Sequence, residues 1–233
     1  MVSAENPVKL YLIRHCETEG NLSRIFQGGI DTPPSEKGLV QLDLLTVRFR
    51  NIHIDKLYSS PLGRAKKTAE AVNRFHNLPI IEDAGLREIS VGLMDGMKWD
   101  MVPVLYYDAA EKWNNAPHEF VSPEGETMRD VFGRISASVR RIVSECEGGE
   151  TVAIVSHGCA LKNLNCCLKY GSIEKLGEVD IGMNTAVSLW EYDGSGFKNV
   201  YMNDASHLPD YSPDRGRRHD FDLSLGRKQN DKV

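Results

Sequence analysis

VKLYLIRHCETEGN, residues 8–21, is the stretch of sequence that decides the fold. Its first part, residues 8–13, is a short and mostly apolar run that ends abruptly at the polar pair Arg14-His15. Such a run is typical of a buried strand in a parallel sheet. The polar residues after it therefore lie at the carboxyl end of a strand, which is where ligands bind in open α/β sheets.

Similar runs recur along the chain and alternate with helical patterns. The strand candidates are residues 8–13, 56–58, 79–82, 151–155, 187–192 and 197–202, the last two forming a hairpin. Apolar residues recur at spacings of three and four in residues 39–49, 62–75, 128–143 and in a segment that starts near residue 160. Strands that alternate with helices predict an α/β fold of three layers, α/β/α, with a mostly parallel central sheet.

Two helices also carry signals at their ends. Pro33-Pro34-Ser35 predicts the start of the first one, and Ser59-Ser60-Pro61 predicts an N-cap and a first-turn proline for the second. In the second helix we expect Phe75 on the buried face, together with the alanines and leucine that precede it at helical spacing.

Two segments depart from the alternating pattern. Residues 96–123 have no clean period, and we expect an irregular, partly helical insertion that caps the pocket. Its aromatic residues are Trp99, Tyr106, Tyr107 and Trp113, which would either contact an apolar leaving group or form a local core. Residues 209–233 are polar and mixed in charge, so we expect a mobile tail after a domain that spans residues 1–208.

Composition bounds the classes of function. The chain has 233 residues, 41% hydrophobic and 26% charged, with a formal net charge of −5. No excess of positive charge favours nucleic acid or an anionic membrane as a partner. The five cysteines are odd in number and include no C-x-x-C, which favours reduced thiols and a cytoplasmic location. We also expect no secretory leader or membrane span.

Cationic and basic side chains gather where the predicted strands end. Arg14 and His15 end the first strand, His157 ends the strand of residues 151–155, and Arg64 opens the helix after the second strand. If these strand ends share one edge, two arginines, two histidines and helix N-termini converge on a pocket that suits a phosphoryl dianion. Alternatives are structural histidines, a solvated arginine, or a zinc site formed by His15, Cys16, His157 and Cys159, although two arginines beside them would oppose a cation.

Residues 12–21, LIRHCETEGN, resemble the R-H-G-E-T-x-x-N signature of the histidine phosphatase superfamily, also called phosphoglycerate-mutase-like. The resemblance covers about residues 8–208. Further pieces occur in the family's order: Gln27-Gly28 with Asp31 and Pro33, Ser59-Ser60-Pro61-Leu62-Gly63-Arg64-Ala65, Leu86-Arg87-Glu88 with Gly92 and Gly96, Gly125-Glu126-Thr127, and Ser156-His157-Gly158.

The resemblance implies a role for each polar residue. His15 would attack phosphorus to form a phosphohistidine, since imidazole is largely neutral near pH 7. Glu88 would protonate the leaving alkoxide and then activate water. Gln27 and Gly28 would help to bind the substrate. The groups that would bind the non-bridging oxygens are Arg14, Arg64, His157 and Asn21.

Within this chemistry the sequence favours a phosphatase over a mutase. Cofactor-dependent mutases of the family typically carry an E-R-H-Y-G segment, whereas this chain has Glu88-Ile89-Ser90-Val91-Gly92. That segment looks more like the broad-specificity phosphatases. The expected substrate is a small phosphomonoester, with no metal or organic cofactor, acted on by a monomer or homodimer.

One residue departs from the family pattern. Cys16 stands where the motif usually has glycine, a position at which a side chain raises the question of crowding in the pocket or of an unusual backbone conformation. Because cysteine is small, we expect it to be tolerated there. A thiol beside the nucleophile would also make the enzyme sensitive to oxidation. The alternatives to a phosphatase are therefore mutase-type phosphoryl transfer and a catalytically weak member of the fold that binds phosphorylated ligands or proteins.

Overall fold

The computed structural model describes residues 1–210 and 220–226. Within them, six strands form one mixed sheet in the order β3-β2-β4-β1-β5-β6. The strands are β1 (Val8–Arg14), β2 (Lys56–Ser59), β3 (Ile80–Glu82), β4 (Thr151–Ser156), β5 (Val187–Tyr192) and β6 (Phe197–Asp204). β3, β2, β4 and β1 run parallel, β5 is antiparallel to β1, and β6 is antiparallel to β5. The predicted mostly parallel sheet is confirmed.

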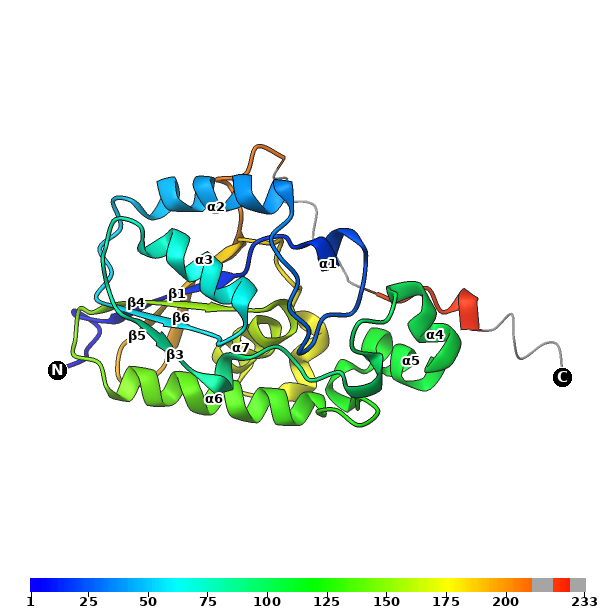
Figure 1. The fold of residues 1–233 in the computed structure, drawn as a ribbon. Coiled ribbons are helices and arrows are strands. Elements are labelled where there is room, and N and C mark those ends of the chain that lie inside the picture. The colour runs from blue at the N-terminus through cyan, green and yellow to red at the C-terminus, as the bar shows by residue number, and fades with distance from the viewer. Residues whose placement is uncertain (211–219, 227–233) are drawn as a thin grey trace, which may run out of the picture.

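Helices cover both faces of this sheet (Figure 1). The main ones are α2 (Glu36–Phe49) and α3 (Gly63–Asn73) on one face and α6 (Met128–Ser144) and α7 (Gly158–Tyr170) on the other. Successive side chains of β1 point to opposite faces of the sheet. Leu12 packs in the core with α6 and α7, whereas Ile13 packs with α2 and α3. The α/β/α prediction is therefore confirmed.

The predicted helix signals were right for α2 and wrong for α3. Ser35 caps α2, its hydroxyl accepting from the Gly38 amide. The N-cap of α3 is Leu62, without a side-chain hydrogen bond, because the Ser60 hydroxyl is engaged with His157 instead. Phe75 lies beyond the end of α3 and is 53% exposed, so its predicted burial was wrong.

The insertion of residues 96–123 stands beyond the end of the sheet at which α1 (Glu19–Leu22) follows β1 (Figure 1). It contains α4 (Val102–Leu105), α5 (Tyr107–Asn115) and 3-10 turns at Trp99–Met101 and Pro117–Glu119. Trp113, Phe120 and Val102 are buried there in a core that they share with Met128 of α6 and Cys159 of α7, and Phe26 joins it from the loop after α1. The prediction of a partly helical insertion is confirmed.

Part of the predicted tail is docked on this insertion. Phe221 is 3% exposed and belongs to the core of the insertion, with Leu223 packed against it. Residues 220–226 were expected to belong to a mobile tail, and in the structure a few of their apolar side chains pack against the insertion. Residues 211–219 and 227–233 of the predicted tail lie outside the described part of the chain.

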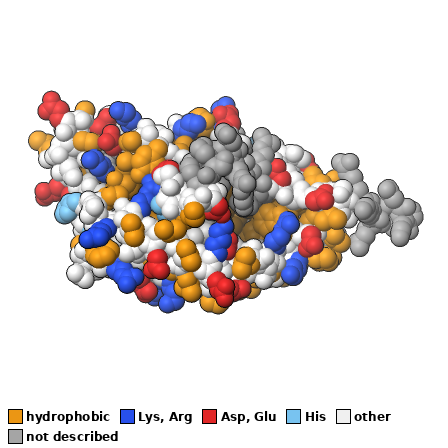
Figure 2. Space-filling view, turned by 90° about the horizontal axis from the view of Figure 1, so that it is seen from above, with side chains coloured by type: hydrophobic (Ala, Val, Ile, Leu, Met, Phe, Trp, Pro, Cys, Tyr) orange, Lys and Arg blue, Asp and Glu red, His pale blue; other side chains and the backbone are white. Residues whose placement is uncertain are grey.

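The surface and the cysteines agree with the composition. Lys and Arg side chains are interspersed with Asp and Glu side chains over the face drawn in Figure 2. All five cysteines are free thiols, as predicted. Among the described helices, none combines the length and the apolar character needed to cross a membrane.

Candidate active site

His15 follows directly after β1 and is 3% exposed. Its Nδ1 lies 2.7 Å from the carbonyl oxygen of Cys16, which can only accept a hydrogen bond. Nδ1 therefore carries the hydrogen. Burial lowers the pKa of the His15 imidazole well below its usual range, and the cationic Arg64 and Arg14 lower it further. A neutral ring with its hydrogen on Nδ1 leaves a lone pair on Nε2.

His157 lies beside His15, although the two residues are far apart in sequence. β4 and β1 are parallel neighbours in register, so both histidines leave the same edge of the sheet, with ring centroids 5.2 Å apart. His157 is fully buried, and its Nε2 is 2.7 Å from the Ser60 hydroxyl. Burial and the nearby Arg64 lower the pKa of His157 well below its usual value. Its Nδ1 has no hydrogen-bond partner among the described residues.

Arg14 lines the cavity at the end of β1. Its Nη1 donates to the Gly182 carbonyl at 2.6 Å. The guanidinium passes over Gly158, where a Cβ would lie only 3.2 Å from Cζ of Arg14. The absence of a side chain at residue 158 therefore lets the first turn of α7 and the arginine approach each other.

Arg64, in the first turn of α3, is 2% exposed. Its Nη1 donates to Asp31 and to the Ile30 carbonyl, and its Nη2 donates to the Gly28 carbonyl. Nε has no partner within the described structure. Arg64 lies at the strand-end edge of the sheet, as expected. Most of its N–H groups, however, donate hydrogen bonds to the loop of residues 28–31.

Glu88 lies at the N-terminus of α7. Its two carboxylate oxygens accept from the amides of Cys159 at 3.1 Å and Ala160 at 3.0 Å, and Oε1 also accepts from its own neighbour Ile89. Anions are favoured at such a position by the free amides and the helix dipole. The structure thus fixes Glu88 in the wall of the cavity that His15 lines.

Asn21, in α1, and Asn184, in the loop before β5, approach His15 from two separate parts of the chain. Oδ1 of Asn21 accepts from the backbone amide and hydroxyl of Thr18, which leaves its Nδ2 amide group for a ligand. Nδ2 of Asn184 donates to the His15 carbonyl at 3.0 Å and lies 3.4 Å from Oδ1 of Asn21. Asn184 was not predicted, because nothing in its local sequence distinguishes it. It lies near His15 because it is in the segment just before β5, the strand that pairs with β1.

Gln27 and Gly28 serve the loop more than the cavity. The side-chain amide of Gln27 lines the cavity but is hydrogen-bonded to Thr18 and Thr32. The Gly28 amide donates to Asp95, its carbonyl accepts from Arg64, and the residue is outside the cavity lining. A Cβ on Gly28 would lie 2.7 Å from the Ile89 carbonyl, so the glycine permits a close backbone approach.

Cys16 fits without strain. Its φ is not in the left-handed region that favours glycine, and its side chain is fully buried away from the cavity lining. Its amide donates to the Thr68 hydroxyl. Burial raises the pKa of the Cys16 thiol, so the reactive thiolate is disfavoured. This geometry agrees with the expected tolerance of cysteine at this position, and a buried thiol with a raised pKa does not favour oxidation.

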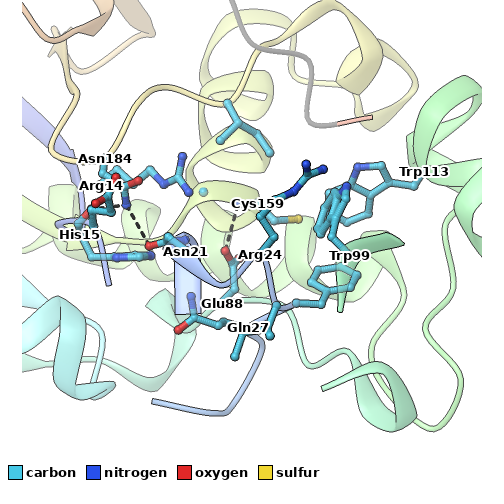
Figure 3. A pocket seen from close by; sticks show the side chains of 15 residues that line it. Arg14, His15, Asn21, Arg24, Gln27, Glu88, Trp99, Trp113, Cys159 and Asn184 are labelled. Atoms are coloured by element: carbon cyan, nitrogen blue, oxygen red, sulfur yellow. Dashed lines mark hydrogen bonds between the residues drawn. The ribbon is translucent and has the colours of Figure 1, made fainter. Parts of the chain in front are cut away.

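These groups surround a cavity of about 610 Å³ with two chemically different halves (Figure 3). The polar half contains Arg14, His15, Glu17, Asn21, Glu88 and Asn184. The other half is mostly apolar and contains Phe26, Trp99 and Trp113, with Arg24 between the two. Tyr106 and Tyr107 are outside the lining. Arg64 and His157 are outside it too, buried behind His15.

Arg24 and Phe26 are cavity residues that sequence reasoning missed. Arg24 has a φ of 51°, which is uncommon for a non-glycine residue, and its carbonyl accepts from the Trp99 amide. Its place three residues after Asn21 was the available signal. Phe26 packs against both Trp99 and Trp113.

Comparison with known proteins agrees with this geometry. The sequence pattern of the histidine phosphatase superfamily (branch 1) matches residues 10–205. Phosphoserine phosphatase 1 of Hydrogenobacter thermophilus is 33% identical over 161 residues, 69% of this chain and 76% of that protein. The broad-specificity phosphatase YOR283W of Saccharomyces cerevisiae is 32% identical over 215 residues, 88% of this chain and 89% of that protein.

Solved structures give the same result for the fold. Bacillus stearothermophilus YhfR superposes with a TM-score of 0.81 at 36% identity, covering 86% of this chain and 98% of its own. The sequence match spans the strand-end histidines, both arginines and the glutamate described above. The chain belongs to branch 1 of the histidine phosphatase superfamily.

Proposed function

We propose that the chain hydrolyses small phosphomonoesters through a phosphohistidine formed on Nε2 of His15. The observation that carries this proposal is the hydrogen bond from Nδ1 of His15 to the Cys16 carbonyl in a buried, neutral ring. It places the lone pair of the imidazole on Nε2. A nucleophile for phosphorus needs such a lone pair beside groups that hold the phosphoryl oxygens.

The first step makes the phosphoenzyme. Nε2 of His15 attacks phosphorus, the N–P bond forms, and the bond from phosphorus to the ester oxygen breaks. Glu88 gives its proton to the departing oxygen, so that an alcohol leaves instead of an alkoxide. Glu88 is held at the start of α7 by two backbone amides, and it lines the same cavity as His15. This position supports the role.

The second step returns the enzyme to its starting state. The Glu88 carboxylate takes a proton from water while the water oxygen attacks phosphorus and the N–P bond breaks. Inorganic phosphate leaves, Nε2 of His15 regains its lone pair, and Glu88 is protonated again for the next turnover. No further reactant is needed, and we propose that the enzyme works without metal or organic cofactor.

Four side chains are proposed to hold the phosphoryl oxygens: Arg14, Arg64, Asn21 and His157. Arg64 offers Nε, which has no partner within the described residues. The Ser60 hydroxyl accepts from the Leu62 amide and can give its hydrogen to Nε2 of His157. That arrangement leaves the ring hydrogen on Nδ1 of His157, as a donor to phosphate.

The substrate is proposed to be a small phosphomonoester, and the relatives named phosphoserine phosphatase and broad-specificity phosphatase support this class. We place the enzyme in the cytoplasm, in line with its free thiols, as a monomer or homodimer. Residues 1–208 are proposed as the catalytic domain, with residues 96–123 as its cap.

The test is phosphate release from p-nitrophenyl phosphate and from a set of sugar, glycerate and amino-acid phosphates, with EDTA present. Wild type should turn over and His15→Ala should not. Quenching in alkaline SDS should trap a base-stable, acid-labile phosphoenzyme in wild type only. Phosphoryl transfer to glycerate phosphates without release to water would indicate a mutase, and no turnover by folded protein would overturn the proposal. Loss of activity in EDTA would contradict the metal-free mechanism.

A further inference from the structure

Trp99 and Trp113 form the apolar wall of the cavity, on the side away from His15 and Arg14 (Figure 3). Their rings lie 5.9 Å apart in an edge-to-face arrangement, and both contact Phe26. A phosphomonoester bound at His15 would direct its leaving group toward this wall. The orientation of the two indoles therefore decides which leaving groups fit.

Trp99 has little support from its own segment. It begins the 3-10 turn Trp99–Met101, which has no side-chain cap, and its amide is hydrogen-bonded to the Arg24 carbonyl. Its indole is instead covered from the other end of the chain. The ring of Phe221 stacks on it with centroids 4.1 Å apart and planes 20° from parallel, and the indole Nε1 lies 3.5 Å from the Asp220 carbonyl.

Phe221 is held in place by the insertion itself. The side chain of Asn114 in α5 accepts from the Phe221 amide and donates to the Phe221 carbonyl, both at 2.8 Å. Further along, Gly226 lies so close to the Pro103 carbonyl that a Cβ there would be 2.3 Å away. The segment is therefore docked on the insertion by backbone hydrogen bonds, by close backbone packing and by ring contacts. The ring of Phe221 also lies near that of Trp113, with centroids 5.9 Å apart.

This segment adds nothing to the two cores that hold the sheet. The buried residues packed against the two faces of the sheet come mainly from the strands and from α2, α3, α6 and α7, and Phe221 is not among them. Phe221 belongs to the cluster that joins the insertion to α6 and α7, which includes Met128 and Cys159. The effect of the segment falls on the apolar wall.

We infer that Phe221, held by Asn114, positions the apolar wall of the substrate site: it fixes Trp99 and Trp113 as the surface that receives a ring-bearing or otherwise apolar leaving group. This inference rests on the proposed phosphatase function. Phe221 acts through the two tryptophans and is absent from the cavity lining, so it is a positioning residue and not a catalytic one.

The consequence is a selective loss when the stack is removed. In Phe221→Ala the indole of Trp99 loses the ring that stacks on its face, so binding of an aromatic leaving group should weaken. Groups that hold the phosphoryl oxygens stay in place, so binding of a small phosphoryl compound should change little. We expect KM for 1-naphthyl phosphate to rise five- to tenfold, with kcat within twofold of wild type.

Two phosphonates, which no phosphatase hydrolyses, test this independently of turnover. Phenylphosphonate and methylphosphonate are titrated calorimetrically into the full-length wild type, Phe221→Ala and Asn114→Ala. Both variants should bind phenylphosphonate at least fivefold more weakly and methylphosphonate within twofold of wild type. Ser224→Ala, an exposed position in the same segment, is the matched control and should bind both like wild type.

Acrylamide quenching of tryptophan fluorescence gives a second readout that needs no ligand. It should increase in Phe221→Ala and Asn114→Ala and stay unchanged in Ser224→Ala. Equal weakening of both phosphonates, or no weakening in either variant, would overturn the inference. Absence of turnover in wild type with the selective phosphonate result intact would overturn the phosphatase proposal alone.

Discussion

Nδ1 of His15 donates its hydrogen to the carbonyl oxygen of Cys16, the next residue in the chain, across 2.7 Å. The nucleophile is therefore oriented by the backbone at residue 16 and not by the side chain there. This relationship explains how a cysteine can stand at a position where the family motif usually has glycine. The carbonyl is present with either residue, and the Cys16 side chain points into the core.

The first prediction concerns Cys16 itself. Cys16→Ala should keep kcat and KM for p-nitrophenyl phosphate within about threefold of wild type, because the backbone hydrogen bond survives the substitution. Wild type should also resist iodoacetamide at pH 7.5, since burial raises the pKa of this thiol. Rapid inactivation that phosphate prevents and Cys16→Ala abolishes would show that the thiol is accessible from the site after all.

Glu88→Gln should separate substrates by the basicity of their leaving groups. An alkyl phosphate needs a proton at the departing oxygen, so its turnover should fall about 10²- to 10⁴-fold. p-Nitrophenolate leaves readily without a proton, so p-nitrophenyl phosphate should lose less in the step that forms the phosphoenzyme. Single-turnover kinetics with both substrates measure this step. An equal loss for both would remove Glu88 from the role of general acid.

Gly158→Ala should weaken phosphate binding without unfolding the protein. The new Cβ would lie 3.2 Å from Cζ of Arg14 and 3.1 Å from Ile181, so the guanidinium must move. We expect the inhibition constant of inorganic phosphate to rise severalfold, up to about tenfold, which corresponds to about 1.4 kcal/mol.

The matched control is Gly133→Ala in the middle of α6, where a Cβ meets no atom within 4 Å among the described residues. It should leave phosphate inhibition unchanged and stabilise the protein by about 0.5–1 kcal/mol, because glycine is unfavourable inside a helix. Unchanged inhibition in Gly158→Ala as well would mean that Arg14 does not bind the phosphoryl group.

Buried histidines should make the protein less stable as the pH falls. Burial lowers the pKa of His15 and His157 well below 6.5, and burial together with Arg48 lowers the pKa of His207 to about 4. Below pH 6.5 these histidines are therefore protonated in the unfolded chain and remain neutral in the folded chain. Each fully buried histidine should reduce the free energy of unfolding by up to about 1.4 kcal/mol per pH unit in this range.

Urea unfolding followed between pH 7.5 and pH 5 measures this slope. His207 lies outside the catalytic cavity. In His207→Gln the free energy of unfolding should depend less steeply on pH, because close to one proton fewer is taken up on unfolding. A free energy of unfolding that is constant over this range, or one that rises as the pH falls, would contradict the neutral state of these rings in the folded protein.

Local sequence determined the sheet and most of the site. The apolar run before Arg14-His15 and the run before His157 each end within one residue of the end of the strand, because these strands are buried between two layers of helices. The helix start at Ser35 followed from capping chemistry that involves neighbours in sequence. Glu88 was identified through its resemblance to a family motif, and the structure brings it to the cavity.

Tertiary structure decided what depends on partners distant in the chain. Ser60 had the sequence of a helix cap, but His157, 97 residues away, takes its hydroxyl. Asn184 reaches His15 only because β5 pairs with β1. Residues 220–226 looked too polar to be ordered, yet Phe221 finds Trp99 and Asn114 in the insertion. Hydrogen bonds and ring contacts between such segments depend on where the fold places the segments in space. A local pattern of residues does not contain this information.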